Sequence, residues 1–176
     1  MLTPSRAIET YLQAKDGNRP DLLRHCFTPA ATLQMQVKTG AISFPPHVQG
    51  RAEIADILVR RFAQEYENVY TFCFGEPPAP GATLHRCRWL VGMSVKSSGE
   101  LRVGCGEYHW QFLAESAQVS HLGITIEHMQ ACPPQYLEPL MDWLQRLEYP
   151  WCQPADVAQS APRLQLIEPI LAYLVP

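Results

Sequence analysis

The first part of the chain carries apolar residues at helical spacing. Thr3 followed by Pro4 is a typical helix start, and we expect a helix from there to Gly17, with a short helix after Pro20. Residues 51–65 repeat apolar side chains every three or four positions, which predicts a longer helix. The apolar stripe of this longer helix consists of Ile54, Ala55, Leu58 and Phe62.

In the middle of the chain the period changes to two, which is typical of strands. We expect one strand over residues 31–38 and, from Asn68 onward, four more strands. Their apolar positions are Tyr70, Phe72 and Phe74; Cys87, Trp89, Val91, Met93 and Val95; Tyr108, Trp110 and Phe112; and Leu122, Ile124 and Ile126. Because no helical stretch separates these four strands, the pattern predicts an α+β protein with an antiparallel sheet.

The third of these four strands changes phase. Its apolar side chains occupy odd positions over 101–105 and even positions over 108–112, with Gly104 and Gly106 at the change. A β-bulge at the glycines would restore a single apolar face and bend the strand. We therefore expect a curved sheet, and a curved sheet can hold a cavity.

The prolines divide the chain into two parts. Of the 16 prolines, eight lie in the last 44 residues and none lies between Gly81 and Cys132. Two apolar helical stripes in the tail, over 137–147 and 164–174, need cover, and Pro169 predicts a kink or break in the second. We expect an α+β domain over 1–132 and a Pro-rich helical extension over 133–176, packed on the domain or on a partner subunit.

Composition excludes several classes of function. A net charge of −3 without a concentrated basic face argues against nucleic-acid binding, and no apolar run is long enough to span a membrane. The first 16 residues carry charges where a signal peptide would be apolar, so we expect a cytoplasmic protein. The six cysteines form no CxxC pair, which favours buried, reduced thiols over a metal site.

Three parts of the sequence carry a resemblance to a known family. They are residues 11–17 leading to 27–31, residues 47–54, and residues 106–112 followed by 119–122. Their order and spacing resemble the nuclear transport factor 2-like superfamily, in particular its SnoaL-like and ketosteroid isomerase-like branch. The resemblance implies a cone-shaped fold in which N-terminal helices close over a concave sheet and leave an apolar pocket. It also implies a homodimer formed through the outer face of the sheet.

The resemblance implies site residues as well. In ketosteroid isomerases a tyrosine and a protonated acid form the oxyanion hole; these positions fall on Tyr11 and Tyr108, both of which can donate a hydrogen bond. The carboxylate base falls on Met35, which cannot accept a proton, so the isomerase reaction itself is not expected. Two hydroxyls that face one pocket can still polarise a carbonyl group.

An enzyme of this kind would need another group to transfer protons, and histidine is the natural candidate near pH 7. His47 lies in a Gly/Pro-rich loop that we expect at the rim of the pocket. His128 shares strand parity with Ile124 and Ile126, which would turn it toward the cavity. The alternative is that His47 is a solvated loop residue and His128 an ordinary core or strand-end residue.

The candidate site therefore has a catalytic and a ligand-binding set. The catalytic candidates are Tyr11, Tyr108, His47 and His128, and the ligand-binding candidates are Met35, Trp89, Trp110 and Ile124. The aromatic members can stack on a flat or hydrophobic ligand, or they can be plain core. No residues have the spacing of a metal site or of a phosphate-binding loop, so we expect no metal and no nucleotide cofactor.

Two functions follow from this sequence. The first is a cofactor-independent lyase or isomerase acting on a small hydrophobic carbonyl or polyketide-like compound. The alternative is a non-catalytic ligand-binding or assembly protein of the same fold. The fold alone does not choose between them, because one fold supports many chemistries.

Overall fold

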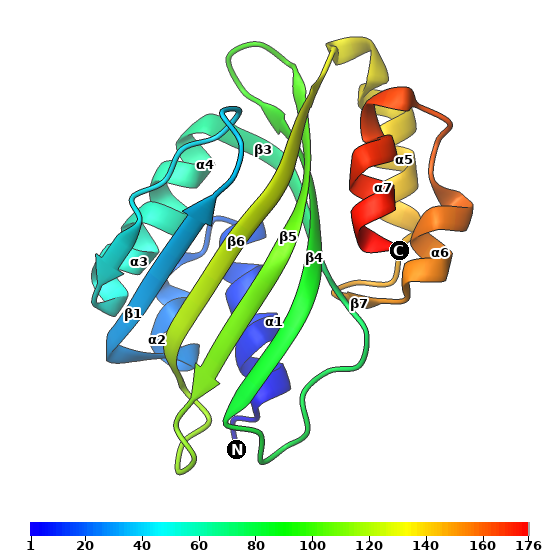
Figure 1. The fold of residues 1–176 in the computed structure, drawn as a ribbon. Coiled ribbons are helices and arrows are strands. Elements are labelled where there is room, and N and C mark those ends of the chain that lie inside the picture. The colour runs from blue at the N-terminus through cyan, green and yellow to red at the C-terminus, as the bar shows by residue number, and fades with distance from the viewer. Residues whose placement is uncertain (176) are drawn as a thin grey trace.

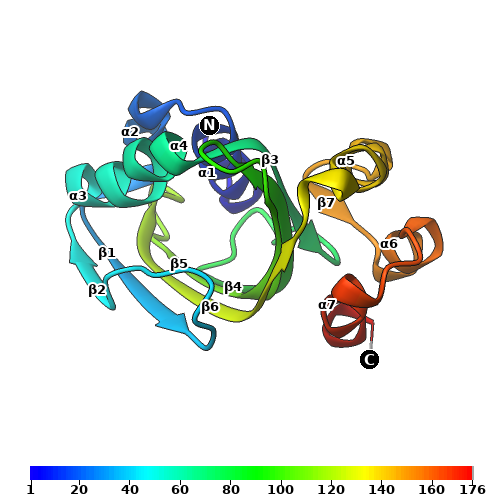
Figure 2. The same ribbon diagram turned by 90° about the horizontal axis from the view of Figure 1, so that it is seen from above.

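A computed structural model describes residues 1–175 and shows a strongly curved sheet with helices on both sides (Figure 1). The N-terminal helices close over the concave side, while the C-terminal helices lie against the outer side, as the view from above shows (Figure 2). This arrangement confirms the predicted α+β cone.

Among the described residues, seven strands form one sheet in the order β2-β1-β6-β5-β4-β3-β7. The strands are β1 (Phe27–Val37), β2 (His47–Gln49), β3 (Tyr66–Phe74), β4 (Leu84–Val95), β5 (Leu101–Phe112), β6 (Val119–Cys132) and β7 (Trp151–Cys152). Neighbours are antiparallel except for β1 with β6 and β3 with β7, which are parallel. The antiparallel run from β3 to β6 is the part predicted by the alternating pattern.

The helices begin and end largely where the sequence predicts, except for a short helix over residues 154–160 that the pattern does not predict. They are α1 (Pro4–Asp16), η1 (Pro20–Leu22), α2 (Leu23–Cys26), α3 (Arg51–Ala55), η2 (Asp56–Arg61), α4 (Phe62–Glu65), η3 (Pro134–Tyr136), α5 (Leu137–Arg146), α6 (Pro154–Ser160), η4 (Gln165–Ile167) and α7 (Glu168–Leu174). Thr3 caps α1, since its hydroxyl accepts a hydrogen bond from the Arg6 amide at 3.2 Å. The long helix over 51–65 is continuous, but its middle segment η2 is π-helical.

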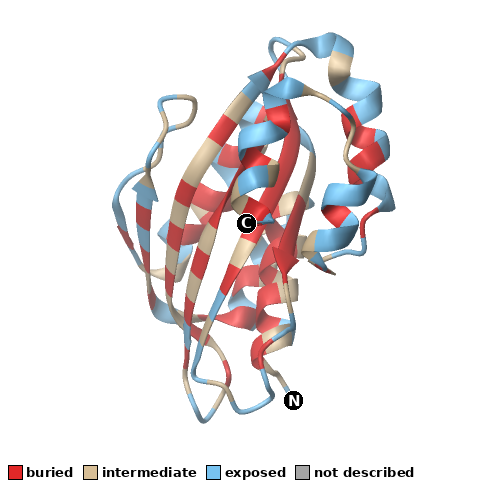
Figure 3. Cartoon of the chain, turned by 45° about the vertical axis from the view of Figure 1, so that its right-hand side comes forward, coloured by how far each residue is buried: buried red, intermediate tan, exposed pale blue. Residues whose placement is uncertain are grey.

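The strand β5 does not change phase, which corrects the predicted bulge in this strand. Its pairing with β4 runs without a break from Leu84 opposite Gln111 to Ser94 opposite Leu101. The apolar residues at odd positions face outward and are buried because the C-terminal helices cover that end of the outer face (Figure 3). The strand is therefore apolar on both faces at one end and on the concave face alone at the other.

The bulge lies in the neighbouring strand β6. Cys105 pairs with His128, and the next residue of β5, Gly106, pairs with Ile126. Glu127 is therefore an extra residue in β6. A bulge of this kind bends its strand and reverses the faces that the following residues present.

The C-terminal extension packs on the outer face of its own sheet. Its apolar residues form one buried cluster with residues of β3, β4, β5 and β6. The members from the strands include Phe72, Phe74, Leu90, Leu101, Val103 and Cys105, and those from the extension include Leu140, Trp143, Leu144, Val157, Ile167 and Ile170. Pro169 lies in the first turn of α7, so it begins that helix rather than kinking it.

The expectations about the cysteines and about membrane-spanning segments can be compared directly with the structure. The six cysteines are all buried and unpaired, as the sequence predicts. Within residues 1–175, no helix has both the length and the apolar character that a membrane crossing requires.

Gly106 is the point of closest approach between β5 and the bulged strand. A Cβ atom at this position would lie 1.8 Å from the Thr125 carbonyl oxygen and 2.8 Å from the Trp89 ring. We predict that Gly106→Ala lowers the free energy of unfolding by about 1–3 kcal/mol or more, because the strands cannot close around the added carbon. Urea denaturation measures this change.

Gly81→Ala is the matched control, because a Cβ there meets no atom within 4 Å. We expect the control to leave the free energy of unfolding within about 0.5 kcal/mol of the wild type. A Gly106→Ala protein as stable as the control would contradict the register of β5 and β6.

Candidate functional site

The concave side of the sheet holds a small cavity beneath α1 and the loop that joins β1 to β2. Its volume is about 50 Å³, which is room for a few water molecules and well below the roughly 300 Å³ of a typical ligand pocket. Most of the interior of the cone is thus filled by side chains. The lining is largely apolar, with a few polar groups from α1, β3 and β5.

The structure brings most of the predicted pocket residues together around this cavity. Tyr11, Met35, Trp89, Tyr108 and Ile124 all contribute to its lining. Met35 therefore lies in the cavity at the position where the resemblance implies a carboxylate base, and it leaves that position without one.

Trp110 is set deeper than predicted. It is fully buried, and its ring centroid lies 5.4 Å from that of Tyr11 and 5.3 Å from that of Tyr108. It is not part of the cavity lining. Its place is the aromatic core that supports the two tyrosine rings from behind.

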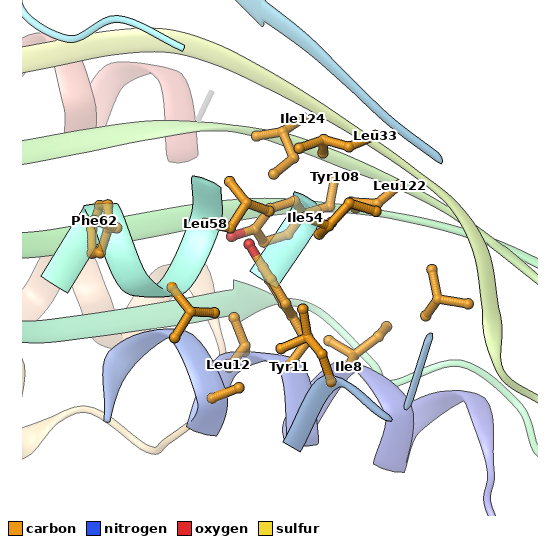
Figure 4. Packing of buried hydrophobic residues seen from close by; sticks show 14 of the residues in the cluster. Ile8, Tyr11, Leu12, Leu33, Ile54, Leu58, Phe62, Tyr108, Leu122 and Ile124 are labelled. Atoms are coloured by element: carbon orange, nitrogen blue, oxygen red, sulfur yellow. The ribbon is translucent and has the colours of Figure 1, made fainter. Parts of the chain in front are cut away.

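The two tyrosines meet at the centre of the interior. Tyr11 comes from α1 and Tyr108 from β5, and their rings lie edge to face with centroids 6.2 Å apart. The two hydroxyls point toward one another (Figure 4). The Tyr11 hydroxyl is buried and makes no hydrogen bond of normal geometry within residues 1–175, although the Tyr108 hydroxyl lies near enough to offset part of the rise in its pKa.

Burial raises the pKa of Tyr11 and the pKa of Tyr108 well above the usual value for a phenol. Both groups therefore keep their protons at neutral pH and act as hydrogen-bond donors. A buried hydroxyl without a partner is unfavourable, and native proteins contain few of them. The Tyr11 hydroxyl is thus available to an acceptor atom, as is Nε1 of Trp89, which lines the same cavity and also lacks a partner.

A charged group that the sequence analysis did not single out also reaches the cavity. Lys15 follows Tyr11 by four residues, so it lies on the same face of α1. Its side chain is 8% exposed, and its ammonium group donates to the Thr71 hydroxyl at 2.7 Å. The ammonium group also lies over the ring of Phe62, 4.7 Å from the centroid. The spacing from Tyr11 was the signal that could have identified it.

Asp16 balances the charge of Lys15. Its Oδ1 lies 2.9 Å from the Lys15 ammonium group and accepts a hydrogen bond from the Thr71 hydroxyl at 2.8 Å. Its Oδ2 accepts from the Thr71 amide at 2.8 Å and from the Tyr149 hydroxyl at 3.4 Å. Because both oxygens already have partners, the carboxylate is an anchor for Lys15 rather than a free base.

The structure turns both candidate histidines away from the cavity. His47 is exposed in the edge strand β2, opposite the exposed Gln34 of β1, so it does not rim the pocket. The parity argument for His128 fails because the bulge at Glu127 reverses the faces of β6. The His128 ring lies on the outer side, 6.1 Å from the ring of Tyr173.

A larger hollow lies outside the inner cavity. We call it the vestibule; it has a volume of about 390 Å³ between the loop residues 40–45 and the helix that includes Arg61 and Glu65. The inner cavity and the vestibule share Ile42, Phe44 and Phe62 in their linings. These three side chains form the wall between the two spaces.

The described residues contain no group of three or more His, Cys, Asp or Glu side chains placed to hold a metal ion. The close pair of Glu107 and His109 lies on the outer face of the sheet and has no third ligand beside it.

No family model matches this sequence, and no curated protein matches it. Solved structures do match its fold. An NTF2-like protein from Burkholderia thailandensis has a TM-score of 0.55 and 14% identity, covering 72% of this chain and 92% of that chain. A protein with a ketosteroid isomerase-like fold from Catenulispora acidiphila, in complex with trimethylamine, has a TM-score of 0.54 and 16% identity, covering 70% and 85%.

An LEH-like epoxide hydrolase from M. tuberculosis matches with a TM-score of 0.52 and 10% identity, covering 70% of this chain and 82% of that chain. At such identities the likeness shows the fold, which is that of the nuclear transport factor 2-like proteins. The neighbours differ in what they do, so the reaction or ligand of this chain has to be argued from its own residues.

The polar groups of the interior make different contributions to stability. We predict that Tyr11→Phe leaves the free energy of unfolding unchanged or raises it by up to about 1 kcal/mol, because it removes a hydroxyl that has no partner. Thr71→Val, of matched shape, should lower it by about 1–3 kcal/mol, because Lys15 and Asp16 each lose a buried partner. Urea denaturation of the two variants measures both effects. A large loss of stability in Tyr11→Phe would show that the hydroxyl has a structural role.

Proposed function

We propose that this protein binds a small apolar molecule that carries a carbonyl group and holds the carbonyl oxygen between Tyr11 and Tyr108. The observation that carries the proposal is the Tyr11 hydroxyl, which is buried, lacks a partner and faces the hydroxyl of Tyr108. A carbonyl oxygen has two lone pairs and can accept a hydrogen bond from each tyrosine.

The remaining polar groups of the interior favour an acceptor ligand over a donor. The hydroxyls and the ammonium group are donors, and Asp16, the nearest carboxylate, is already engaged by Thr71 and Lys15. A ligand that needed to donate a hydrogen bond would find no carboxylate free to accept it there. The apolar lining, which includes Met35, Val91 and Ile124, favours a hydrocarbon body.

Binding without catalysis is the form of this function that we favour. Met35 stands where a carboxylate base would be expected, and His47 and His128 lie outside the lining. In this proposal the chain has the two donor positions that the resemblance to the SnoaL-like and ketosteroid isomerase-like branch implies, and no base beside them. A carbonyl held in this way is polarised but is not deprotonated.

A cofactor-independent lyase or isomerase, acting on a hydrophobic carbonyl or polyketide-like compound, is the second candidate. One observation favours it: Lys15 is a titratable group in the lining, one helical turn from Tyr11. In an enzyme of this kind the side-chain nitrogen of Lys15 would act at the carbon beside the bound carbonyl, in place of the base that Met35 cannot provide.

Assembly and location are also part of the proposal. The extension covers one end of the outer sheet face, so the homodimer implied by the resemblance would form through the uncovered part around β1 and β6. Six buried, unpaired cysteines support a reducing compartment, and we place the protein in the cytoplasm.

An apolar aryl ketone tests the binding proposal. The probe 6-propionyl-2-(dimethylamino)naphthalene changes its emission when it leaves water, so binding is read by fluorescence titration. We expect saturable binding to the wild type and an affinity about tenfold lower for Tyr11→Phe and for Tyr108→Phe, since each loses one hydrogen bond to the ketone. Tyr70→Phe, whose ring packs in the outer cluster, is the matched control and should bind like the wild type. Equal affinity in all four proteins would contradict the proposal.

Exchange of the protons beside the ketone distinguishes a binder from an enzyme. In D₂O, an enzyme that enolises the bound probe replaces its α-protons with deuterium, and proton NMR follows the loss of their signal. For a binder we expect the same exchange rate with and without protein. Catalysed exchange that Lys15→Met abolishes while probe binding persists would instead establish the second candidate.

A further inference from the structure

Phe62 lies where three internal spaces meet. It contributes to the lining of the inner cavity, of the vestibule and of a third hollow of about 270 Å³ between the end of α1 and the start of β3. The inner cavity by itself is too small for any of the ligands considered above. A ligand that reaches the Tyr11 hydroxyl therefore needs more room than the cavity offers, and the vestibule behind the shared wall is the largest of the spaces that adjoin it.

Two neighbouring side chains hold the Phe62 ring in its place between the cavity and the vestibule. The Lys15 ammonium group lies 4.7 Å from its ring centroid, and the Tyr66 ring lies 4.9 Å away. Phe62 also follows η2 directly, and π-helical segments are rare and frequently found at functional sites. Rotation of the ring would exchange these contacts for space between the vestibule and the inner cavity.

The other two members of the wall belong to a weakly attached loop. The backbone of residues 40–45 makes a single hydrogen bond among the described residues, from the Ala41 amide to the hydroxyl of the adjoining Thr39. Ile42 and Phe44 hold the loop on the core by apolar contact. Segments with few backbone hydrogen bonds and little buried area open at low free energy.

We propose that the inner cavity and the vestibule are two halves of one binding site, separated by a gate that consists of Phe62 with Ile42 and Phe44. This inference rests on the proposed function and names its ligand class. The combined volume is that of an ordinary small-molecule pocket. The ligand is an elongated apolar ketone or aldehyde that enters with its carbonyl end first and leaves its other end in the vestibule.

The vestibule limits the chemistry of the trailing end. Arg61 is paired with Asp56 at 2.8 Å, and Glu65 lines the same space with Tyr66. Charges of both signs stand beside the opening, so a free charge on the ligand would meet repulsion as well as attraction. A neutral polar group, such as a hydroxyl or an amide, suits this end of the site.

Kinetics of the aryl ketone test the gate. With stopped-flow fluorescence we expect Phe62→Ala to raise both the association rate and the dissociation rate at least about fivefold, with a smaller change in affinity, because the barrier lies on the path rather than in the bound state. Phe74→Ala is the matched control, since its side chain is equally buried but lies in the outer cluster. Phe62→Leu serves in place of Phe62→Ala if the larger truncation does not fold.

A measurement without ligand tests the gate independently of the proposed function. Trp89 lines the inner cavity, so opening of the gate should increase quenching of tryptophan fluorescence by acrylamide in Phe62→Ala but not in Phe74→Ala. If the ketone does not bind the wild type, the proposed function fails, and quenching still decides whether Phe62 is a gate. Unchanged quenching and unchanged rates in Phe62→Ala would overturn the gate.

The vestibule half of the site has its own test. Ser43 is exposed and lines the vestibule, so Ser43→Trp should fill this space without disturbing the core. We expect this variant to bind the aryl ketone at least about tenfold more weakly than the wild type at unchanged stability, because the trailing end loses its place. Wild-type affinity in Ser43→Trp would show that the vestibule is not part of the site.

Discussion

The Asp16 carboxylate is the group on which the interior of this protein depends. It accepts hydrogen bonds from the amide and the hydroxyl of Thr71, which fixes the end of α1 to β3. The same carboxylate balances Lys15, and a buried ammonium group without such a partner would be strongly unfavourable. With α1 held at this point, Tyr11, which lies on the same face of the helix as Lys15, points toward Tyr108. The donor pair and the charge of the cavity are thus consequences of one attachment.

The second constraint is that the sheet is buried on both faces at one end. The inner face packs against the N-terminal helices and the outer face against the extension, which makes two separate clusters from one sheet. The outer cluster keeps the curved strands in place without filling the cone. The inner face carries its aromatic and hydroxyl side chains around the small cavity.

Much of the fold could be predicted because short-range patterns carry it. Helical spacing located α1 and the helix over 51–65, alternation located the run from β3 to β6, and the Tyr11, Tyr108 and Met35 positions followed from a resemblance in motif order. The bulge was placed in the wrong strand because a strand covered on both faces looks like a strand that changes phase. His128 was then assigned to the wrong side, since a single extra residue at Glu127 reverses every later position in β6.

The sequence by itself determined α1, the helix over 51–65 and the run of strands from β3 to β6, because periodicity is a local property. It also determined that two phenols and one thioether stand at the pocket positions, whereas β2, β7 and α6 carry no pattern that predicts them. Only the tertiary structure decided that Tyr11 lacks a partner, that Lys15 is buried beside it and that Phe62 stands between the cavity and the vestibule. These facts depend on contacts between residues more than 45 positions apart, such as Lys15 with Phe62 and with Thr71. The periodicity of one segment does not predict which distant side chains will be buried together. In this protein those distant contacts bring polar groups to the cavity.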